Sequence, residues 1–158
     1  MEEAGKKTLS YLEKLCSMRE YCRKDIFEKA FARTQDESLA AELVEKLVGE
    51  GYVDDLRYAS AFARDKSVIT GWGPVKISRA LYLKKIPSDV VKMALTSIDA
   101  DKAADKLDRA LESRYRVLRE DPSVRLKLIK FALSRGYEYD AVSKAVDRVL
   151  KSDSDGRR

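Results

Sequence analysis

The fold of this chain is decided at residues 51–59, which read Gly-Tyr-Val-Asp-Asp-Leu-Arg-Tyr-Ala. Gly51 suits the left-handed backbone position that follows many helices, because glycine has no Cβ to oppose it. The carboxylate of Asp54 or Asp55 can then accept a hydrogen bond from a free N–H group in the first turn of a new helix. The stretch therefore predicts the end of one helix and the start of the next.

A second stretch, residues 71–77, repeats this arrangement with the sequence Gly-Trp-Gly-Pro-Val-Lys-Ile. Pro74 suits the first position of a helix, where the N–H that proline lacks would have no partner. Trp72 has two interpretations: an anchor packed where two helices meet, or a platform on which a nucleic-acid base stacks. The small number of aromatic residues near it in the sequence favours packing.

The pair Asp54 and Asp55 could also be a metal-binding or catalytic pair of carboxylates. Adjacent residues on a helix point about 100° apart, however, and no third acid joins them at a suitable spacing. Catalysis has little other support, because the chain has no histidine and its two cysteines, Cys16 and Cys22, have no obvious activating partner. We therefore expect capping by the aspartates, reduced thiols, no enzyme activity, no metal and no cofactor.

The composition favours an all-α protein. Of the 158 residues, 44% are apolar and 37% are charged, which suits amphipathic helices that bury one stripe and expose the rest. Seven glycines and three prolines leave few breaks in such helices. The longest uncharged run, residues 67–75, is far too short to cross a bilayer. We expect a cytoplasmic protein with no membrane partner, and a monomer.

Apolar residues recur at helical spacing in segments that form three groups of three. At a constant offset of 51 residues, apolar positions of the three groups coincide. The coinciding triplets are Ile26, Ile77, Leu128; Ala30, Leu81, Ala132; Leu39, Val90, Ala141; Leu43, Ala94, Ala145; and Leu47, Ile98, Val149. We predict three tandem three-helix repeats in an elongated, curved array. The predicted boundaries are a flexible N-terminus at 1–7, repeats at 8–53, 54–98 and 99–150, and a flexible tail at 151–158.

Positive charge is concentrated in the second and third groups, although the net charge of the chain is only +5. Segments 66–88 and 122–137 contain basic residues and no acidic ones. Several of these basic residues coincide at the offset of 51, whereas the first group has Asp25 and Glu28 at two of the same positions. The candidates for binding a partner protein or DNA are Lys76, Arg79, Lys84, Lys85, Arg125, Lys127, Lys130 and Arg135.

Two interpretations of these eight residues, which we call the basic set, stay open. They can form a ridge that faces phosphates or an acidic protein groove, and each phosphate contact would then add to the salt sensitivity of binding. They can also be the solvated faces of two amphipathic helices. Any single residue is better explained as solvated, whereas the coincidence of the whole set favours binding.

The motifs quoted above resemble the RecX family, the bacterial regulators of the RecA recombinase. The resemblance covers about residues 9–150. It is carried by residues 19–22 (Arg-Glu-Tyr-Cys), by residues 51–59, and by Gly71 and Gly73 followed by Ile77 and Leu81. The chain departs from the family at three positions, where family members usually have serine, glutamate and often glycine in place of Cys22, Asp25 and Lys85.

The resemblance implies a non-enzymatic regulator that lies in the helical groove of the RecA–DNA filament. It implies a role in homologous recombination, DNA repair and the SOS response. Such a regulator would modulate, and most often inhibit, ATP hydrolysis, strand exchange and the co-protease activity of the filament. RecA is then the expected partner, with single- or double-stranded DNA as a further one. The alternative is a stand-alone DNA-binding module in which the helix after Pro74 is the recognition helix.

Overall fold

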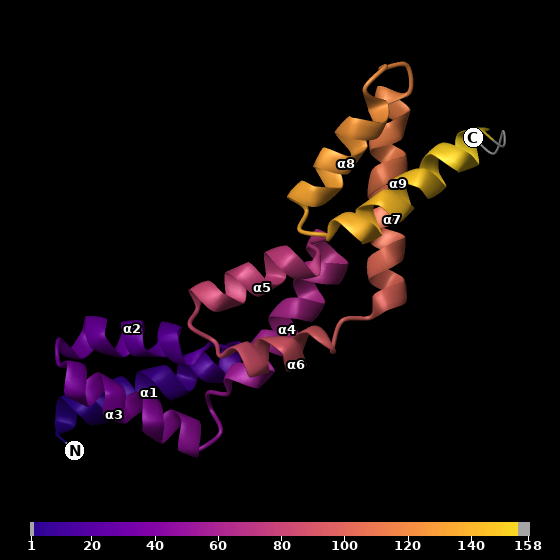
Figure 1. Ribbon diagram of the computed structural model, residues 1–158. Helices are drawn as coiled ribbons and strands as arrows, with labels where there is room; N and C mark the ends of the chain where they lie inside the picture. Colours follow the sequence, from indigo (N-terminus) through magenta and orange to yellow (C-terminus); the bar gives the residue numbers. More distant parts are fainter. Residues whose placement is uncertain (1, 155–158) are drawn as a thin grey trace. The chain divides into compact units, whose positions relative to one another are not determined.

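The computed structural model describes residues 2–154 (Figure 1). Within that range the chain forms nine α-helices and one π-helical turn, with no strand, so the all-α prediction is confirmed. The elements are α1 (Glu3–Met18), α2 (Arg23–Thr34), α3 (Glu37–Gly49), α4 (Asp55–Asp65), η1 (Lys66–Thr70), α5 (Pro74–Leu83), α6 (Ser88–Leu95), α7 (Ala100–Leu118), α8 (Val124–Ser134) and α9 (Tyr139–Ser154).

The first and last helices extend beyond their predicted bounds. Helix α1 begins at Glu3 rather than at residue 8, and α9 continues to Ser154, into the segment predicted as a tail. The last turn of α9 is held to α7, because Tyr115 donates a hydrogen bond to Asp153 and Arg119 forms an ion pair with it at 3.0 Å. The rest of the predicted tail, residues 155–158, and residue 1 lie outside the described residues.

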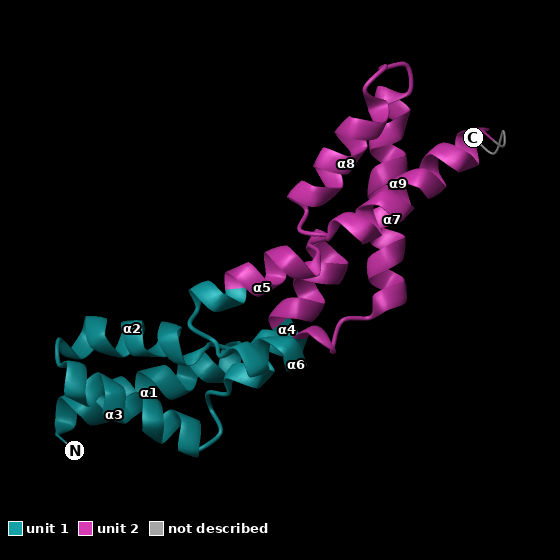
Figure 2. Ribbon diagram, in the orientation of Figure 1, with its two compact units in different colours: residues 1–61, 81–94 teal, residues 62–80, 95–158 magenta. Residues whose placement is uncertain are grey.

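The described chain divides into two compact units (Figure 2). Unit 1 comprises the residues up to Ala61 together with Leu81–Ala94, and unit 2 comprises Phe62–Ala80 together with the residues from Leu95 onward. Helices α4 and α5 each contribute residues to both units. The boundaries of the three repeats given above stay a prediction.

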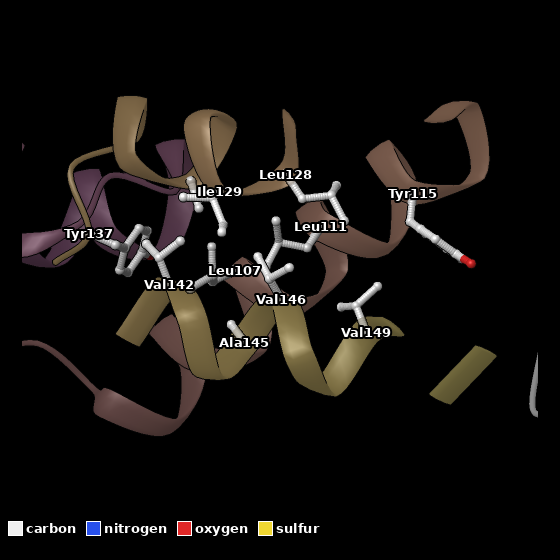
Figure 3. Packing of buried hydrophobic residues seen from close by; sticks show 11 residues of the cluster. Leu107, Leu111, Tyr115, Leu128, Ile129, Tyr137, Val142, Ala145, Val146 and Val149 are labelled. Carbon is white, nitrogen blue, oxygen red and sulfur yellow. The ribbon is translucent and has the colours of Figure 1, made fainter. Parts of the chain in front are cut away.

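Each unit has its own hydrophobic core. In unit 1, helices α1, α2 and α3 pack together, and their largest fully buried side chains are Leu12, Ile26, Leu43 and Leu47. In unit 2, helices α7, α8 and α9 do the same (Figure 3), with Leu111, Leu128, Val142 and Val146 at the centre. Burying one such side chain stabilises the fold by about 1.5–3 kcal/mol, so these stripes account for the helical packing.

Burial agrees with the 51-residue register at three of the predicted triplets. All three members are completely buried in the triplets that begin with Ile26, Ala30 and Leu43. In the other two triplets only Leu47 and Val149 are buried; Leu39, Val90 and Ile98 are partly buried, and Ala141 is exposed. Helix α6 ends at Leu95, so Ile98 lies in the connection to α7 rather than on a helix. Ile98 and Ala141 both line a cavity described below.

Helix α3 ends as the sequence predicts. Gly51 has φ = 82°, in the left-handed region. Its N–H donates to the carbonyl oxygen of Val48 at 3.1 Å, and the N–H of Tyr52 donates to that of Leu47 at 2.9 Å. This pair of hydrogen bonds is the Schellman motif, which satisfies carbonyl groups that the helix leaves open.

The two adjacent aspartates cap two different helices. Asp54 accepts a hydrogen bond from the N–H of Arg57 at 3.0 Å and so caps its own helix, α4. Asp55 instead accepts from the N–H of Arg23 at 2.9 Å and caps α2, whose own preceding residue, Cys22, offers no side-chain cap. The predicted capping role therefore holds for both, but the partner of Asp55 lies in a distant part of the sequence.

Arg57 completes this junction. Its Nε forms an ion pair with Glu20 Oε2 at 2.7 Å, and its Nη2 donates to the carbonyl oxygens of Gly51 at 3.0 Å and Tyr52 at 3.2 Å. The hydrogen bond to Glu20 raises the pKa of Arg57 above its usual range. One side chain thus ties the end of α3 and the chain before α2 to the start of α4.

Candidate functional site

The basic set is divided between the two units. Lys84 and Lys85 belong to unit 1 and lie directly after α5. The other six belong to unit 2: Lys76 and Arg79 on α5, Arg125, Lys127 and Lys130 on α8, and Arg135 directly after α8. The structure therefore brings together six of the eight predicted residues within one compact unit.

Within unit 2, the end of α8 meets the start of α5 through the backbone. The N–H of Gly73 donates to the carbonyl oxygen of Arg135 at 2.7 Å, and the N–H of Val75 donates to that of Gly136 at 2.9 Å. A Cβ on Gly73 would lie 2.4 Å from the carbonyl oxygen of Gly136, and one on Gly136 would lie 2.3 Å from Cβ of Lys76. Gly136 also has φ = 94°. Only glycine fits at this contact, which places Arg135 beside the start of α5.

Three members of the basic set are paired with acids. The hydrogen bond to Asp25 raises the pKa of Lys84, and the hydrogen bond from Lys127 lowers the pKa of Asp121. Exposed ion pairs such as Arg125–Asp147 contribute little to stability and can exchange partners, whereas the Asp25 side chain is only 16% exposed. The three pairs are Lys84–Asp25 at 2.8 Å, Arg125–Asp147 at 3.4 Å, and Lys127–Asp121.

The remaining members of the set have no ion pair among the described residues. Arg79, Lys85 and Lys130 are exposed. Lys76 Nζ lies 4.6 Å from the centre of the Trp72 ring. Arg135 lies over the ring of Phe131 and donates to the carbonyl oxygen of Thr70 at 3.2 Å. Arg79 and Lys130 are therefore the members of the set in unit 2 that are exposed and form no ion pair among the described residues.

Trp72 is half-buried and takes part in packing. Phe62 meets its ring edge-on, with the ring centres 6.2 Å apart. The ammonium groups of Lys66 and Lys76 lie 4.7 and 4.6 Å from the ring centre, within the range of a cation–π interaction. The favoured packing interpretation of Trp72 agrees with these contacts.

Two further cations, Lys66 and Lys106, lie near Gly71 and Trp72 and are not members of the basic set. Lys66 contacts Trp72, and the side chain of Lys106 lies 3.5 Å from the position of a Cβ on Gly71. Lys66 is part of the acid-free segment and could have been included on that ground. Lys106 lies among acidic residues of α7, so nothing in its local sequence indicates where it points.

Unit 2 also contains a cavity of about 400 Å³, which the sequence analysis did not predict. It is formed by the segment 67–74, by residues 95–107 and by α9. Two of its lining residues, Ser67 and Tyr137, have buried hydroxyl oxygens without a hydrogen-bond partner among the described residues. Neither residue belongs to a recognisable motif, because a single hydroxyl in an amphipathic helix or loop has no distinctive pattern.

The described residues include no group of three or more possible ligands that could hold a metal ion. Both cysteines are free thiols. Burial raises the pKa of Cys22 to about 11, so its thiol is protonated and unreactive at neutral pH. Between residues 2 and 154, no helix is both long and apolar enough to cross a membrane.

Comparison with known proteins connects these features to one family. A family model described as "RecX, second three-helix domain" matches residues 54–95, which contain α4, α5 and α6. A relative from Mycobacterium sp. (strain KMS), named regulatory protein RecX, is 26% identical over 155 residues, covering 94% of this chain and 85% of the relative. A relative of the same name from Chlorobium phaeobacteroides (strain BS1) is 27% identical over 147 residues, covering 93% of this chain and 96% of its own length.

Solved structures support the same assignment at the level of the fold. The crystal structure of RecX from Lactobacillus salivarius superimposes with a TM-score of 0.85 at 19% identity, covering 94% of this chain and 98% of that one. A crystal structure of regulatory protein RecX gives a TM-score of 0.82 at 21% identity, covering 92% and 72% of the two chains. These matches agree with the predicted helical-repeat architecture. The chain has the caps at residues 51–57 and the contact between Gly73 and Gly136, and its relatives match it along nearly its whole length. This chain belongs to the RecX family of regulatory proteins.

Proposed function

We propose that this protein regulates the RecA recombinase by binding in the groove of the RecA–DNA filament. In this role it inhibits ATP hydrolysis, strand exchange and the co-protease activity of the filament. The observation that carries the proposal is the match to proteins named regulatory protein RecX over 93% and 94% of the chain. The role requires no catalytic group, in keeping with the lack of histidine and the raised pKa of Cys22.

The basic residues of α5 and α8 are the proposed contact surface in unit 2. Arg79 and Lys130 have no ion pair among the described residues, so binding a phosphate or carboxylate breaks no internal contact. Arg125 and Lys127 are paired with acids, but exposed pairs of this kind cost little to exchange. Because a filament carries closely spaced phosphates, binding through these residues should weaken steeply as salt rises.

The direct test measures the DNA-dependent ATPase activity of the cognate RecA on single-stranded DNA. Substoichiometric amounts of this protein should reduce the ATPase rate, because one molecule in the groove affects several filament subunits. Filament length, measured by light scattering or electron microscopy, should change in parallel. Addition at equimolar amounts without effect on either quantity would refute the proposal.

Charge reversal tests the contact surface. Arg79→Glu with Lys130→Glu should lower affinity for the filament at least about tenfold, since two contacts to charged groups are lost. The free energy of unfolding should change by no more than about 0.5 kcal/mol per site, because both side chains are exposed. The matched control is Lys7→Glu with Lys14→Glu, which changes the net charge equally at two exposed positions of α1. Equal effects of the two double variants would count against the surface.

Naked DNA separates this proposal from a stand-alone DNA-binding module with α5 as the recognition helix. The first turn of α5 packs against the backbone of Arg135 and Gly136, which argues against its entry into a duplex groove. We therefore expect weaker binding to naked duplex DNA than to the filament at physiological salt. Tight binding to naked duplex, with a steep salt dependence, would favour the alternative.

A further inference from the structure

The cavity in unit 2 exposes apolar side chains at repeat positions that are buried elsewhere in the chain. Leu95 and Ile98 line this cavity of about 400 Å³, and both are only partly buried. At the offset of 51, their counterparts in the first and third groups are at most 5% exposed: Val44, Leu47, Val146 and Val149. The second group therefore presents core-type side chains that the described part of unit 2 does not cover completely.

The accessible wall of the cavity is apolar. Trp72 is half-buried in it, and Ala104 and Ala141 are exposed. The hydroxyl oxygens of Ser67 and Tyr137 are buried, so an occupant does not reach them. Burial of apolar surface is favourable in proportion to its area, whereas a buried polar group without a partner costs free energy. A large apolar side chain therefore suits this wall, and the polar edges of a nucleobase do not.

The charged residues that line the cavity are cations. Lys144 and Arg148 on α9 are exposed, and none of the described residues of the lining is acidic. Lys144 has no ion pair among the described residues, and the pair between Arg148 and Asp108 is exposed enough to exchange partners. Lys66 and Lys76 lie next to Trp72 and add positive charge. Charge complementarity thus favours an apolar occupant whose neighbours are carboxylates.

We propose that the cavity receives one large apolar side chain, such as phenylalanine, from an acidic segment of a partner protein. The inference rests on the proposed function, in which the partner is a subunit of the RecA filament. At protein interfaces, a few anchors in desolvated pockets carry most of the binding energy, and a polar rim surrounds them. Here the cavity is the pocket, and Lys144 and Arg148 form the rim. This contact is separate from the one at Arg79 and Lys130, which depends on charge.

Filling the cavity tests the apolar contact. Ala104→Leu places a larger side chain in the wall, and binding is measured by cosedimentation with preformed filaments on single-stranded DNA. We expect affinity at least about tenfold lower than for the unmodified chain, because the anchor no longer enters. The melting temperature should stay constant or rise, since the new side chain covers apolar surface. The matched control is Ala32→Leu at an exposed position of α2, which should bind the filament normally.

The outcomes separate this inference from the proposed function. If the unmodified chain does not cosediment with the filament, both are refuted. If the unmodified chain binds and Ala104→Leu binds equally well, only the cavity is refuted as a contact. Affinity for naked oligothymidylate should be the same for the unmodified chain and for Ala104→Leu. An equal loss of affinity for the filament and for oligothymidylate would overturn the inference and assign the cavity to nucleic acid.

Charge reversal tests the acidic character of the partner segment. Lys144→Glu should lower affinity for the filament about fivefold at low salt, and this difference should shrink at about 0.5 M salt, where exposed charges are screened. The loss caused by Ala104→Leu should persist there, because salt does not screen the burial of apolar surface. The matched control is Lys102→Glu, at an exposed position of α7 outside the cavity lining. Equal effects of the two charge reversals would overturn the acidic occupant.

A dye gives an independent measurement on the protein alone. 8-Anilinonaphthalene-1-sulfonate combines apolar rings with one anionic group, as the proposed occupant does. Trp72 is the only tryptophan in the chain and lines the cavity, so its emission should be quenched as the dye binds. Ala104→Leu should remove most of this quenching, whereas Ala32→Leu should leave it unchanged. Absence of dye binding, or binding that Ala104→Leu does not weaken, would overturn the inference.

Discussion

Two helix junctions of this protein are built in different ways. The junction at residues 50–57, in unit 1, is joined by side chains: Asp55 caps α2, and Arg57 binds Glu20 and two carbonyl groups at the end of α3. The junction between α8 and α5, in unit 2, is joined by backbone groups, with Gly73 and Gly136 in direct contact. Glycine occurs in both, but for different reasons.

Two different requirements can make glycine necessary at a position: a positive φ, or a lack of room for a Cβ. Gly51 has φ = 82° and nothing within 4 Å of the position that a Cβ would occupy, so only its backbone conformation demands glycine. Gly73 has no positive φ but faces a carbonyl oxygen at 2.4 Å, so only the contact demands it. Gly136 combines both, whereas Gly49 has neither. A side-chain junction can lose one contact at a time, but a backbone junction has no room for even one methyl group.

Gly136→Ala should have the largest effect. The new Cβ would stand 2.3 Å from Cβ of Lys76, and the residue would be held at φ = 94°. Adding the costs of overpacking and of backbone strain, we expect the free energy of unfolding to fall by about 3–5 kcal/mol. Urea denaturation followed by circular dichroism measures it. Gly49→Ala, in a helix with open space around it, is the control and should be neutral or slightly stabilising.

Gly73→Ala should have the next largest effect, because the contact acts there without an unusual φ. The carbonyl oxygen of Gly136 would have to move away from the new Cβ, and we expect a loss of about 2–3 kcal/mol. Gly51→Ala isolates the other requirement and should cost only about 1–2 kcal/mol. If Gly51→Ala proved as damaging as Gly73→Ala, the distinction between the two junctions would fail.

Removal of the Asp55 side chain should lower the free energy of unfolding by a smaller amount, and it should destabilise α2 rather than α4, the helix that contains Asp55. Asp55→Ala leaves the N–H of Arg23 without its cap, and we expect a loss of about 1–2 kcal/mol together with fraying of the first turn of α2. Thiol labelling measures the fraying, because Cys22 directly precedes that turn and is completely buried. Asp54→Ala should cost about 1 kcal/mol without faster labelling of Cys22, since Asp54 caps α4. Equal labelling rates in the two variants would contradict the assignment.

Lys85→Gly should have the smallest effect and the opposite sign. Lys85 has φ = 60° at the end of α5, in the same pattern of hydrogen bonds that Gly51 completes after α3. Glycine would relieve the strain, and we expect a gain of about 0.5–1 kcal/mol, or a melting temperature higher by about 2–4 °C. Lys85→Ala keeps the strained conformation and should give no gain. An equal gain from alanine would show that the charge, not the conformation, is responsible.

Much of the helical layout could be predicted from the sequence because its causes are local. The Gly51 turn, the caps at Asp36 and Asp54, and the proline at the start of α5 depend on neighbouring residues. The three completely buried triplets follow from the apolar period of the helices. The basic set could also be identified from the sequence, because the absence of acidic residues from a segment needs no structure to be recognised. Its members could not be sorted into paired and unpaired groups, because acids such as Asp25 and Asp147 come from other helices.

The amino-acid sequence by itself determined most of the helix boundaries between α2 and α8, most of the faces that the helices bury, and where positive charge accumulates. These properties depend on interactions within a few residues, so their signals stand side by side in the chain. Only the tertiary structure decided that Asp55 caps α2, that Gly73 meets Gly136, and that Ser67 and Tyr137 share a cavity. Each of these pairs joins segments far apart in the sequence, and packing rather than any local preference brings them together.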